Sequence, residues 1–351
     1  MSNLATALDL VPDSSTTDTQ PENLRVFLSE LTAAGFIDAG LSQSSAPIAK
    51  SGELIHELAS KCLSSAFVTW SHRMTSEYID RFGSAFLRAQ LLPQLLAGER
   101  IGSTALATAL ADRSGKELLP ITFERVDGHY LINGLIPWAS NLYSDTLVVF
   151  AAREPNTQER KLFATELSFA GISVKPAEGL LALNATASGT VKFEGLELSE
   201  DYVLDVVVDE FFSRMRPRFL LLQTAFCLGL TSASLESAKS ANGAGPFVAE
   251  LEDFQEQFDD LISRWEALLQ KQEDFASLPA KQDPLPYLEL RLAAAVLAQA
   301  VSRVELASVG GRGYFVANPT SRRVRESLFL SVQAPTEGSL RWEISQLKSR
   351  G

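Results

Sequence analysis

One carboxylate near the C-terminal end of the sequence stands where it could remove a proton from a substrate. Glu337 lies in the stretch 332–339, which reads VQAPTEGS. A positioned glutamate can act as a general base. The same carboxylate can instead belong to the first turn of a helix, because Thr336 or Ser339 can cap that helix and a negative charge there suits the helix dipole. Taken alone, these eight residues favour the capping role.

The other titratable residues give weaker indications of chemistry. His56 and His72 lie in helical patterns and His129 in a predicted turn, with no carboxylate at a spacing that makes a dyad. Cys62 and Cys227 have apolar neighbours and no histidine or second cysteine at metal-ligand spacing. We therefore predict structural histidines, two buried thiols in a reducing, cytoplasmic compartment, and no metal site.

Composition and charge exclude several classes of partner. The 351 residues are 46% hydrophobic, and 43 acidic against 31 basic side chains give a net charge of −12. A chain of this charge is poorly suited to nucleic acid or to an anionic membrane surface. No run of about 18 consecutive apolar residues marks a membrane span. We expect a globular, soluble protein that binds neither nucleic acid nor membrane.

Four regions of different pattern must position these residues. Residues 1–20 are rich in Ser, Thr and Asp and are predicted to be a disordered tail. In residues 21–100 apolar side chains recur every three or four positions, which indicates an N-terminal helical domain. Residues 101–204 form a β-domain, and 205–351 return to helical periodicity in pieces long enough for a C-terminal bundle.

The β-domain is predicted from short apolar runs such as ITFERV, TLVVFAA and KLFATEL. Glycine-containing pairs interrupt or bound these runs, and such pairs favour tight turns between antiparallel strands. The pairs are Asp127-Gly128, Asn133-Gly134 and Glu194-Gly195.

The order of landmarks along the chain resembles the acyl-CoA dehydrogenase superfamily over nearly all of the sequence after the tail. The landmarks are LLPQLLAGER, DGHYLINGLIPWAS, VKFEGLELSEDYVL, ASVGGRGY and RRVRESLFLSVQAPTEGS. The resemblance implies an α+β multidomain fold with an N-terminal helical domain, a central antiparallel β-domain and a C-terminal four-helix bundle. It also implies FAD, with FMN as the alternative, bound between the β-domain and the bundle of a homodimer or homotetramer.

The resemblance also assigns residues to the cofactor. Thr108 falls on a threonine that addresses the edge of the flavin ring, and Trp138 and Ser140 fall on the aromatic and the hydroxyl of the ring site. Hydroxyl groups and an indole wall are what an isoalloxazine ring needs, because its edge forms hydrogen bonds and its faces need apolar cover. Gly310 and Gly311 fall where glycines let the backbone approach the adenylate half of FAD from the adjoining subunit.

Other positions depart from the family pattern. Ala307 stands where the family has glutamine, and Gly245 or a neighbour stands where it has an arginine for the pyrophosphate. On the acyl-CoA side, Asn184, Thr186 and Ser188 replace the residues that help receive the CoA chain in many relatives.

Two registers compete for the catalytic base. If Arg325 is matched to the family's arginine without a gap, the base position falls on Ala334, while Thr336 and Arg341 match the threonine and arginine that follow. If three residues are inserted, Glu337 overlays the base. We favour the gap-free register, which makes Thr336 a flavin-site residue and Glu337 a first-turn carboxylate.

Three functions follow from these observations. The first is a flavin-dependent oxidoreductase that acts on a CH–CH group of an acyl thioester, with the acyl group bound to CoA or to a carrier protein. The expected partner is an acyl-thioester or small-molecule substrate. The second is a flavin-dependent monooxygenase on the same fold, which does not need the glutamate base. The third is a non-catalytic member of the family.

Overall fold

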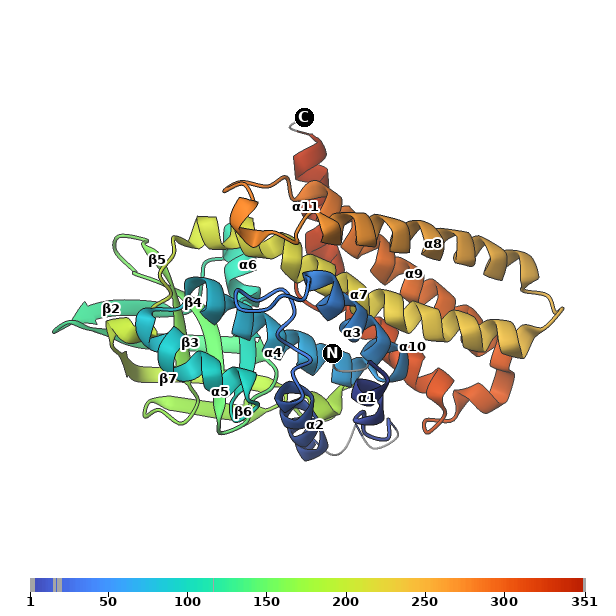
Figure 1. Cartoon of the computed structure of the whole chain (residues 1–351), viewed down its shortest axis with the longest axis horizontal. Helices are drawn as coiled ribbons and strands as arrows, with labels where there is room; N and C mark the ends of the chain where they lie inside the picture. The colour runs from blue at the N-terminus through green and yellow to red at the C-terminus, as the bar shows by residue number, and fades with distance from the viewer. Residues whose placement is uncertain (1–3, 15–16, 18–20, 116, 350–351) are drawn as a thin grey trace.

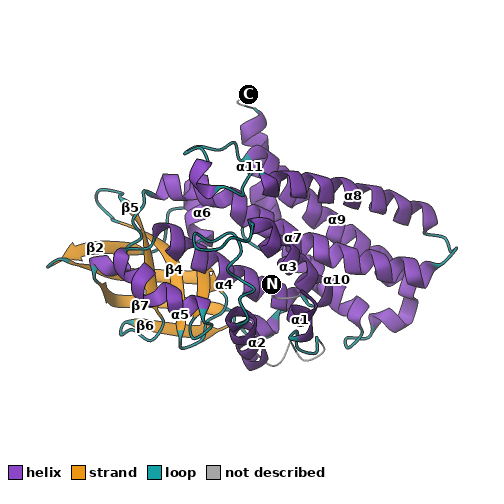
Figure 2. Cartoon of the chain, in the orientation of Figure 1, coloured by secondary structure: helices purple, strands orange, loops and turns teal. Residues whose placement is uncertain are grey.

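The computed structural model describes residues 4–14, 17, 21–115 and 117–349. A β-sheet forms one end of the molecule, and the helices form the rest (Figures 1 and 2). The arrangement confirms the predicted fold class, in which helices precede and follow a central β-domain.

The N-terminal helices pack around one almost completely buried helix, Leu63–Phe82. Their bounds are α1 Leu4–Asp9, α2 Pro21–Ala33, α3 Ile48–Lys61, α4 Leu63–Phe82 and α5 Leu92–Leu96, with a π-helical turn at Leu87–Leu91. The prediction of a disordered tail is wrong for α1, which packs on α3. Its apolar side chains at positions 4, 7 and 8 fall on one helical face, and Ala7 is fully buried. Residues 1–3, 15–16 and 18–20 of that tail lie outside the described residues.

The sheet holds β1 Ile101–Ala105, β2 Thr122–Val126, β3 His129–Ala139, β4 Thr146–Arg153, β5 Arg160–Glu166, β6 Ile172–Pro176 and β7 Gly189–Leu198. Its order is β1-β4-β2-β3-β7-β6, with β5 also paired to β4. The β-domain is not wholly antiparallel, because β4 runs parallel to both β1 and β2. Strand β4 is buried on both faces, as its continuous apolar run TLVVFAA favours.

Only one of the three predicted turns is a turn. Asp127 and Gly128, with φ of 49° and 81°, join β2 to β3 in a hairpin. Asn133-Gly134 and Glu194-Gly195 lie inside β3 and β7, where the ladder changes register. The Asn133 side chain accepts the Gly195 N–H at 2.8 Å, so the extra residue forms a bulge instead of reversing the chain.

The C-terminal region forms the predicted helical bundle. Its helices are α7 Val208–Asn242, α8 Val248–Gln270, α9 Leu285–Val309, α10 Pro319–Val332 and α11 Glu337–Lys348. Helices α7 and α9 pack side by side, and α8, α10 and α11 pack against them. Helix α7 also packs closely on α3, because Gly229 leaves no side chain between them; a Cβ there would lie 2.0 Å from the His56 carbonyl oxygen.

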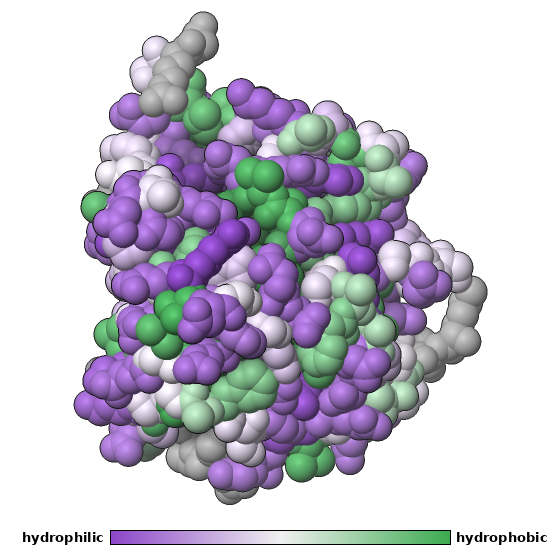
Figure 3. Space-filling view, turned by 90° about the vertical axis from the view of Figure 1, so that its left-hand side faces the viewer, coloured by the Kyte–Doolittle hydropathy of each residue, from purple (hydrophilic) through white to green (hydrophobic). Residues whose placement is uncertain are grey.

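Two helical segments, Val208–Asn242 and Leu285–Tyr314, are long and apolar enough to cross a membrane. In the first, 83% of the apolar stretch is buried inside the protein, and in the second 44%. Core helices of globular proteins share this length and composition. At the sheet end of the molecule, hydrophobic residues form separate patches on a mostly hydrophilic surface (Figure 3).

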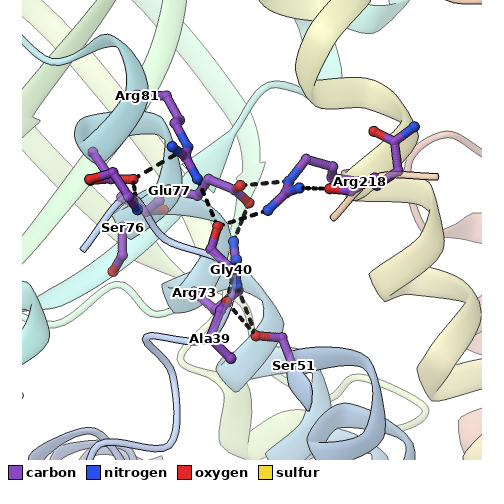
Figure 4. A network of polar contacts seen from close by, with 12 residues as sticks. Ala39, Gly40, Ser51, Arg73, Ser76, Glu77, Arg81 and Arg218 are labelled. Atoms are coloured by element: carbon purple, nitrogen blue, oxygen red, sulfur yellow. Dashed lines mark hydrogen bonds and ion pairs between the residues drawn. The ribbon is translucent and has the colours of Figure 1, made fainter. Parts of the chain in front are cut away.

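A buried group of charges joins the N-terminal helices to the bundle (Figure 4). The Glu77 carboxylate on α4 pairs with Arg73 on the same helix and, at 2.6 Å, with Nε of Arg218 on α7. All three side chains are at most 1% exposed. The Gly40 carbonyl accepts hydrogen bonds from Arg81 at 2.8 Å and from Arg218 at 2.9 Å. The guanidiniums therefore also hold the loop before α3 in place.

Candidate functional site

A β-bulge turns Trp138 outward from the sheet. Between Ile136 and Ala139, β3 has one residue more than the facing part of β7, where Val191 and Gly189 are the partners. Such an extra residue breaks the alternation of side chains and can re-aim one of them. The Trp138 side chain is 42% exposed, although its strand neighbours Ile136 and Ala139 are buried. An exposed indole on a rigid strand can cover a planar ligand.

Thr108 places a hydroxyl without a protein partner beside the same strands. It lies at the start of α6 Ala107–Arg113, which follows directly after β1. Its Oγ1 is shielded from solvent and has no hydrogen-bond partner among the described residues. Buried hydroxyls are normally hydrogen-bonded, so a lone one is a candidate ligand contact.

Ser140 lies at the end of β3 and is fixed by its backbone to β1. The Ser103 hydroxyl on β1 donates to the Ser140 carbonyl at 2.6 Å. Because β1 leads into α6, the same strand end positions both Ser140 and Thr108. Ser140 and Thr108 are thus both positioned from β1, and Trp138 lies two residues before Ser140, on β3.

The Ser140 side chain is buried and hydrogen-bonded, unlike that of Thr108. Its hydroxyl lies 2.7 Å from the Ser188 hydroxyl, which lies 2.7 Å from the Thr186 hydroxyl. Thr186 donates in turn to the Leu183 carbonyl at 2.7 Å. The exposed fractions of Ser140, Ser188 and Thr186 are 4%, 6% and 1%. We call these three residues the hydroxyl chain.

The residues predicted to stand on the acyl-CoA side are engaged within the protein. Thr186 and Ser188 belong to the hydroxyl chain. The Asn184 side chain closes on the backbone of Leu180, accepting from its N–H at 2.9 Å and donating to its carbonyl at 2.8 Å. In this arrangement all three side chains hold their own loop.

Glu337 occupies the first turn of α11, as the capping interpretation predicts. Thr336 is the N-cap residue, and its hydroxyl accepts the Ser339 N–H at 3.2 Å. The Glu337 carboxylate pairs with Arg341 one turn further along, at 2.8 Å. Thr336 therefore has a structural role in the protein, and its predicted contact with the cofactor stays a prediction.

Ala334 lies in the short connection between α10 and α11. Its carbonyl accepts a hydrogen bond from Gln223 of α7 at 3.0 Å. The neighbouring Gln333 side chain accepts from Arg291 of α9 at 2.8 Å. Two bundle helices thus fix this connection, and the methyl group of Ala334 offers no acid or base.

Gly310 and Gly311 directly follow α9. In Figure 1 the C-terminal end of α9 lies on the side of the molecule away from the sheet. Gly310 has a φ of 72°, a conformation that a helix C-terminus often requires of glycine. Nothing lies within 4 Å of a Cβ at either glycine. The residues that follow, Tyr314, Phe315 and Val316, are 80%, 72% and 76% exposed. The structure does not bring these glycines to the ring-site residues of the same chain.

Asn141 and His72, neither of them a predicted ring-site residue, fix the backbone beside Ser140. Asn141 is fully buried with a φ of 60°, and its amide nitrogen donates to the carbonyls of Val68 and Gly102, each at 3.0 Å. His72 Nδ1 accepts the Gly102 N–H at 2.8 Å. Burial lowers the pKa of His72 to about 4, so its ring is neutral at pH 7. The only sequence signal was the position of Asn141 directly after Trp-Ala-Ser.

Cys62 and Cys227 are free and buried, as predicted. Burial raises the pKa of both thiols, which keeps them in the unreactive protonated form. Over the part of the chain that the structure describes, no three His, Cys, Asp or Glu side chains are grouped to hold a metal ion.

No family model matches the chain. It is 26% identical over 273 residues to the mitochondrial isovaleryl-CoA dehydrogenase of Arabidopsis thaliana. The matched region covers 73% of this chain and 65% of that protein. The chain therefore matches somewhat less than two thirds of the length of this curated relative.

Two solved structures have the same fold. Butyryl-CoA dehydrogenase from Megasphaera elsdenii superimposes with a TM-score of 0.84 at 17% identity, covering 98% of this chain and 96% of that one. Acyl-CoA dehydrogenase complexed with FAD from Bacillus anthracis gives a TM-score of 0.85 at 17% identity, covering 99% of this chain and 66% of that one. In fold the chain is thus similar to solved acyl-CoA dehydrogenases, and in sequence it is similar to curated ones.

Proposed function

We propose that the protein is an FAD-dependent oxidoreductase whose flavin ring lies against Trp138, with Thr108 and Ser140 at the ring edge. The observations that carry this proposal are the exposed indole of Trp138 on β3 and the buried Thr108 hydroxyl, which has no hydrogen-bond partner among the described residues. A flavin ring would cover the indole and give the hydroxyl a partner. The FAD complex of the Bacillus anthracis relative supports the choice of cofactor.

We propose an acyl group on a thioester as the parent substrate class, because the curated relatives are named as acyl-CoA dehydrogenases. When bound, the flavin would accept the hydride of such an oxidation. This chain's own contribution would be to hold the ring and to exclude water around it. Asn184, Thr186 and Ser188 are occupied with internal hydrogen bonds, so recognition of the thioester carrier would have to come from other residues.

A monooxygenase is the second candidate, and the presence of alanine at position 334, where the dehydrogenase would need a base, favours it. Removal of the α-proton of a thioester requires a base. Ala334 cannot supply one, and Glu337 is engaged with Arg341. The reaction of a reduced flavin with oxygen does not need a carboxylate base, so a monooxygenase activity is compatible with alanine at position 334.

One pair of assays tests the proposed function and separates the candidates. The protein reconstituted with FAD is mixed anaerobically with a panel of saturated acyl-CoAs, and the oxidised flavin band is followed. In parallel, oxygen uptake is measured with supplied reduced flavin and the same compounds. Because alanine at position 334 supplies no base, we expect no bleaching by any acyl-CoA, and compound-dependent oxygen uptake would then favour the monooxygenase. Bleaching would instead restore the dehydrogenase, and the absence of both would point to a non-catalytic member.

We further propose that the protein works as a homodimer or homotetramer. The exposed segment Tyr314–Val316 supports this, since three consecutive large apolar side chains rarely face solvent without a partner. The segment follows Gly310 and Gly311 directly, so a second subunit seated here could bring these glycines to the adenylate end of the FAD bound by its neighbour.

A further inference from the structure

The hydroxyl chain has only one consistent arrangement of protons. The Leu183 carbonyl can only accept, so the Thr186 hydroxyl donates its proton there. The Thr186 oxygen must then accept from Ser188, and the Ser188 oxygen must accept from Ser140. Each serine or threonine hydroxyl has one proton to donate. The single proton of Ser140 is therefore used inside the protein, and only lone pairs of its oxygen remain for a ligand.

The backbone around the hydroxyl chain holds this arrangement rigidly. Leu183 and Ala187, which flank the turn of Thr186, have φ of 62° and 44°, and Asn141, next to Ser140, has a φ of 60°. Residues other than glycine adopt this left-handed conformation at a cost, and such strain tends to gather at functional sites. Two backbone hydrogen bonds of 2.9 Å, Asn141 N–H to the Thr186 carbonyl and Leu142 N–H to the Ala187 carbonyl, join the two segments.

We propose that Ser140 presents its hydroxyl to the flavin as a hydrogen-bond acceptor, with Ser188 and Thr186 as the positioning residues that fix this polarity. Facing N5 of the ring, such an acceptor matches a dihydroflavin, which carries a hydrogen on N5, whereas N5 of oxidised flavin is itself an acceptor. The site then binds reduced FAD more tightly than a donating hydroxyl would allow. This inference rests on the proposed flavin site.

Affinity for the two redox forms of FAD tests the proposal without any catalytic assay. Dissociation constants for oxidised FAD and, anaerobically, for photoreduced FAD are measured for the wild type and for Ser188→Ala. In the variant the Ser140 proton loses its acceptor and turns to the flavin. We expect the preference for reduced over oxidised FAD to fall about two- to tenfold, the worth of one hydrogen bond. A tenfold change lowers the midpoint potential of a two-electron couple by about 30 mV.

Two further variants separate polarity from a general loss of structure. Thr186→Val keeps the side-chain shape but removes the hydroxyl oxygen that accepts the Ser188 proton. The Ser188 proton then turns toward Ser140, whose own proton is freed. The preference should shift in the same direction as in Ser188→Ala. Ser103→Ala is the matched control, because it removes a buried hydroxyl that contacts the Ser140 carbonyl and not its side chain. The ratio of the two affinities should stay at the wild-type value.

The outcomes distinguish this inference from the proposed function. If neither form of FAD binds the wild type, the proposed flavin site is wrong, and the inference is overturned with it. If FAD binds but Ser188→Ala and Thr186→Val leave the preference unchanged, the flavin site stands and the acceptor role of Ser140 is wrong. A shift of the same size in Ser103→Ala would also overturn the acceptor role.

Discussion

At the scale of single residues, the role of a side chain follows from what its polar atoms already contact. The sequence makes both Glu337 and Ser140 candidate site residues. In the structure, Glu337 pairs with Arg341 and Ser140 with Ser188, while the Thr108 hydroxyl has no hydrogen-bond partner within the described part of the chain. Local sequence predicts the helix-capping position of Glu337, because the cap and the ion pair lie within one helical turn. It could not predict the hydroxyl chain, whose members come together only through the pairing of β3 with β7.

The Glu337→Gln variant tests the capping assignment. The exchange keeps the side-chain size and removes one exposed ion pair and one favourable charge at a helix start, each worth about 0.3–1 kcal/mol at most. We expect the free energy of unfolding to fall by less than about 1 kcal/mol in urea titrations. The rate of flavin reduction by any reductant should not change. A loss on the order of a hundredfold in the reductive half-reaction with an acyl-CoA would make Glu337 the base after all.

At the scale of elements, periodicity predicts the helices and strands, whereas their partners depend on distant contacts. The bundle helices and the runs TLVVFAA and KLFATEL are found as predicted. The parallel pairing of β1 with β4 was missed, because the intervening α6 and the β2–β3 hairpin carry no signal for direction. The pair Asn133-Gly134 was misjudged since the sequence of a bulge and that of a turn are alike.

The contact between α4 and β1 gives a pH prediction. His72 accepts the Gly102 N–H in its neutral form, and burial lowers its pKa from 6.5 to about 4. The unfolded chain takes up a proton near pH 6.5 and the folded chain only near pH 4. The stability that neutral His72 contributes is therefore complete above pH 6.5 and is lost as the pH falls toward 4, by up to about 3 kcal/mol.

Urea titrations between pH 7.5 and pH 4 measure this loss. The wild type should lose stability steadily across that window. His72→Gln, which cannot titrate, should be less stable at pH 7 but should show a flatter dependence above pH 5. Equal slopes in the two proteins would mean that His72 does not cause the loss.

At the scale of the whole molecule, buried charges hold the N-terminal helices on the bundle. Burial alone would raise the pKa of Glu77, but Arg218 and Arg73 lower it below its usual range. Nothing in the sequence indicates this pairing, because Arg73 and Glu77 lie on α4 and Arg218 lies on α7, far apart along the chain. Removing one partner of a buried ion pair leaves the others uncompensated, which is far more costly than losing a surface pair.

Glu77→Gln should therefore destabilise the fold by about 3–5 kcal/mol. The control is Glu250→Gln, which breaks the exposed pair with Arg303 and should cost about 0–1 kcal/mol. Both values come from chemical unfolding at pH 7. Similar small losses in the two variants would show that the buried pair contributes little to the fold.

The proposed assembly is also a property of the whole molecule. Sedimentation at micromolar concentration should give a dimer or tetramer, and Phe315→Asp should shift it toward the monomer because a charge replaces a large apolar contact. A monomeric wild type would contradict the proposed assembly. An unchanged oligomer in Phe315→Asp would place the interface elsewhere.

Titration of the purified protein with FAD is the most direct test of the proposed flavin site. We expect a shift of the flavin absorption bands and quenching of flavin fluorescence at tens of micromolar FAD. Trp138→Ala should weaken binding at least about fivefold, because the lost ring contact is worth on the order of 1 kcal/mol. Trp342→Ala, which removes an indole exposed to 41% on α11 against 42% for Trp138, should bind FAD like the wild type. No spectral change with FAD or FMN, or equal weakening by the two variants, would contradict a flavin site at Trp138.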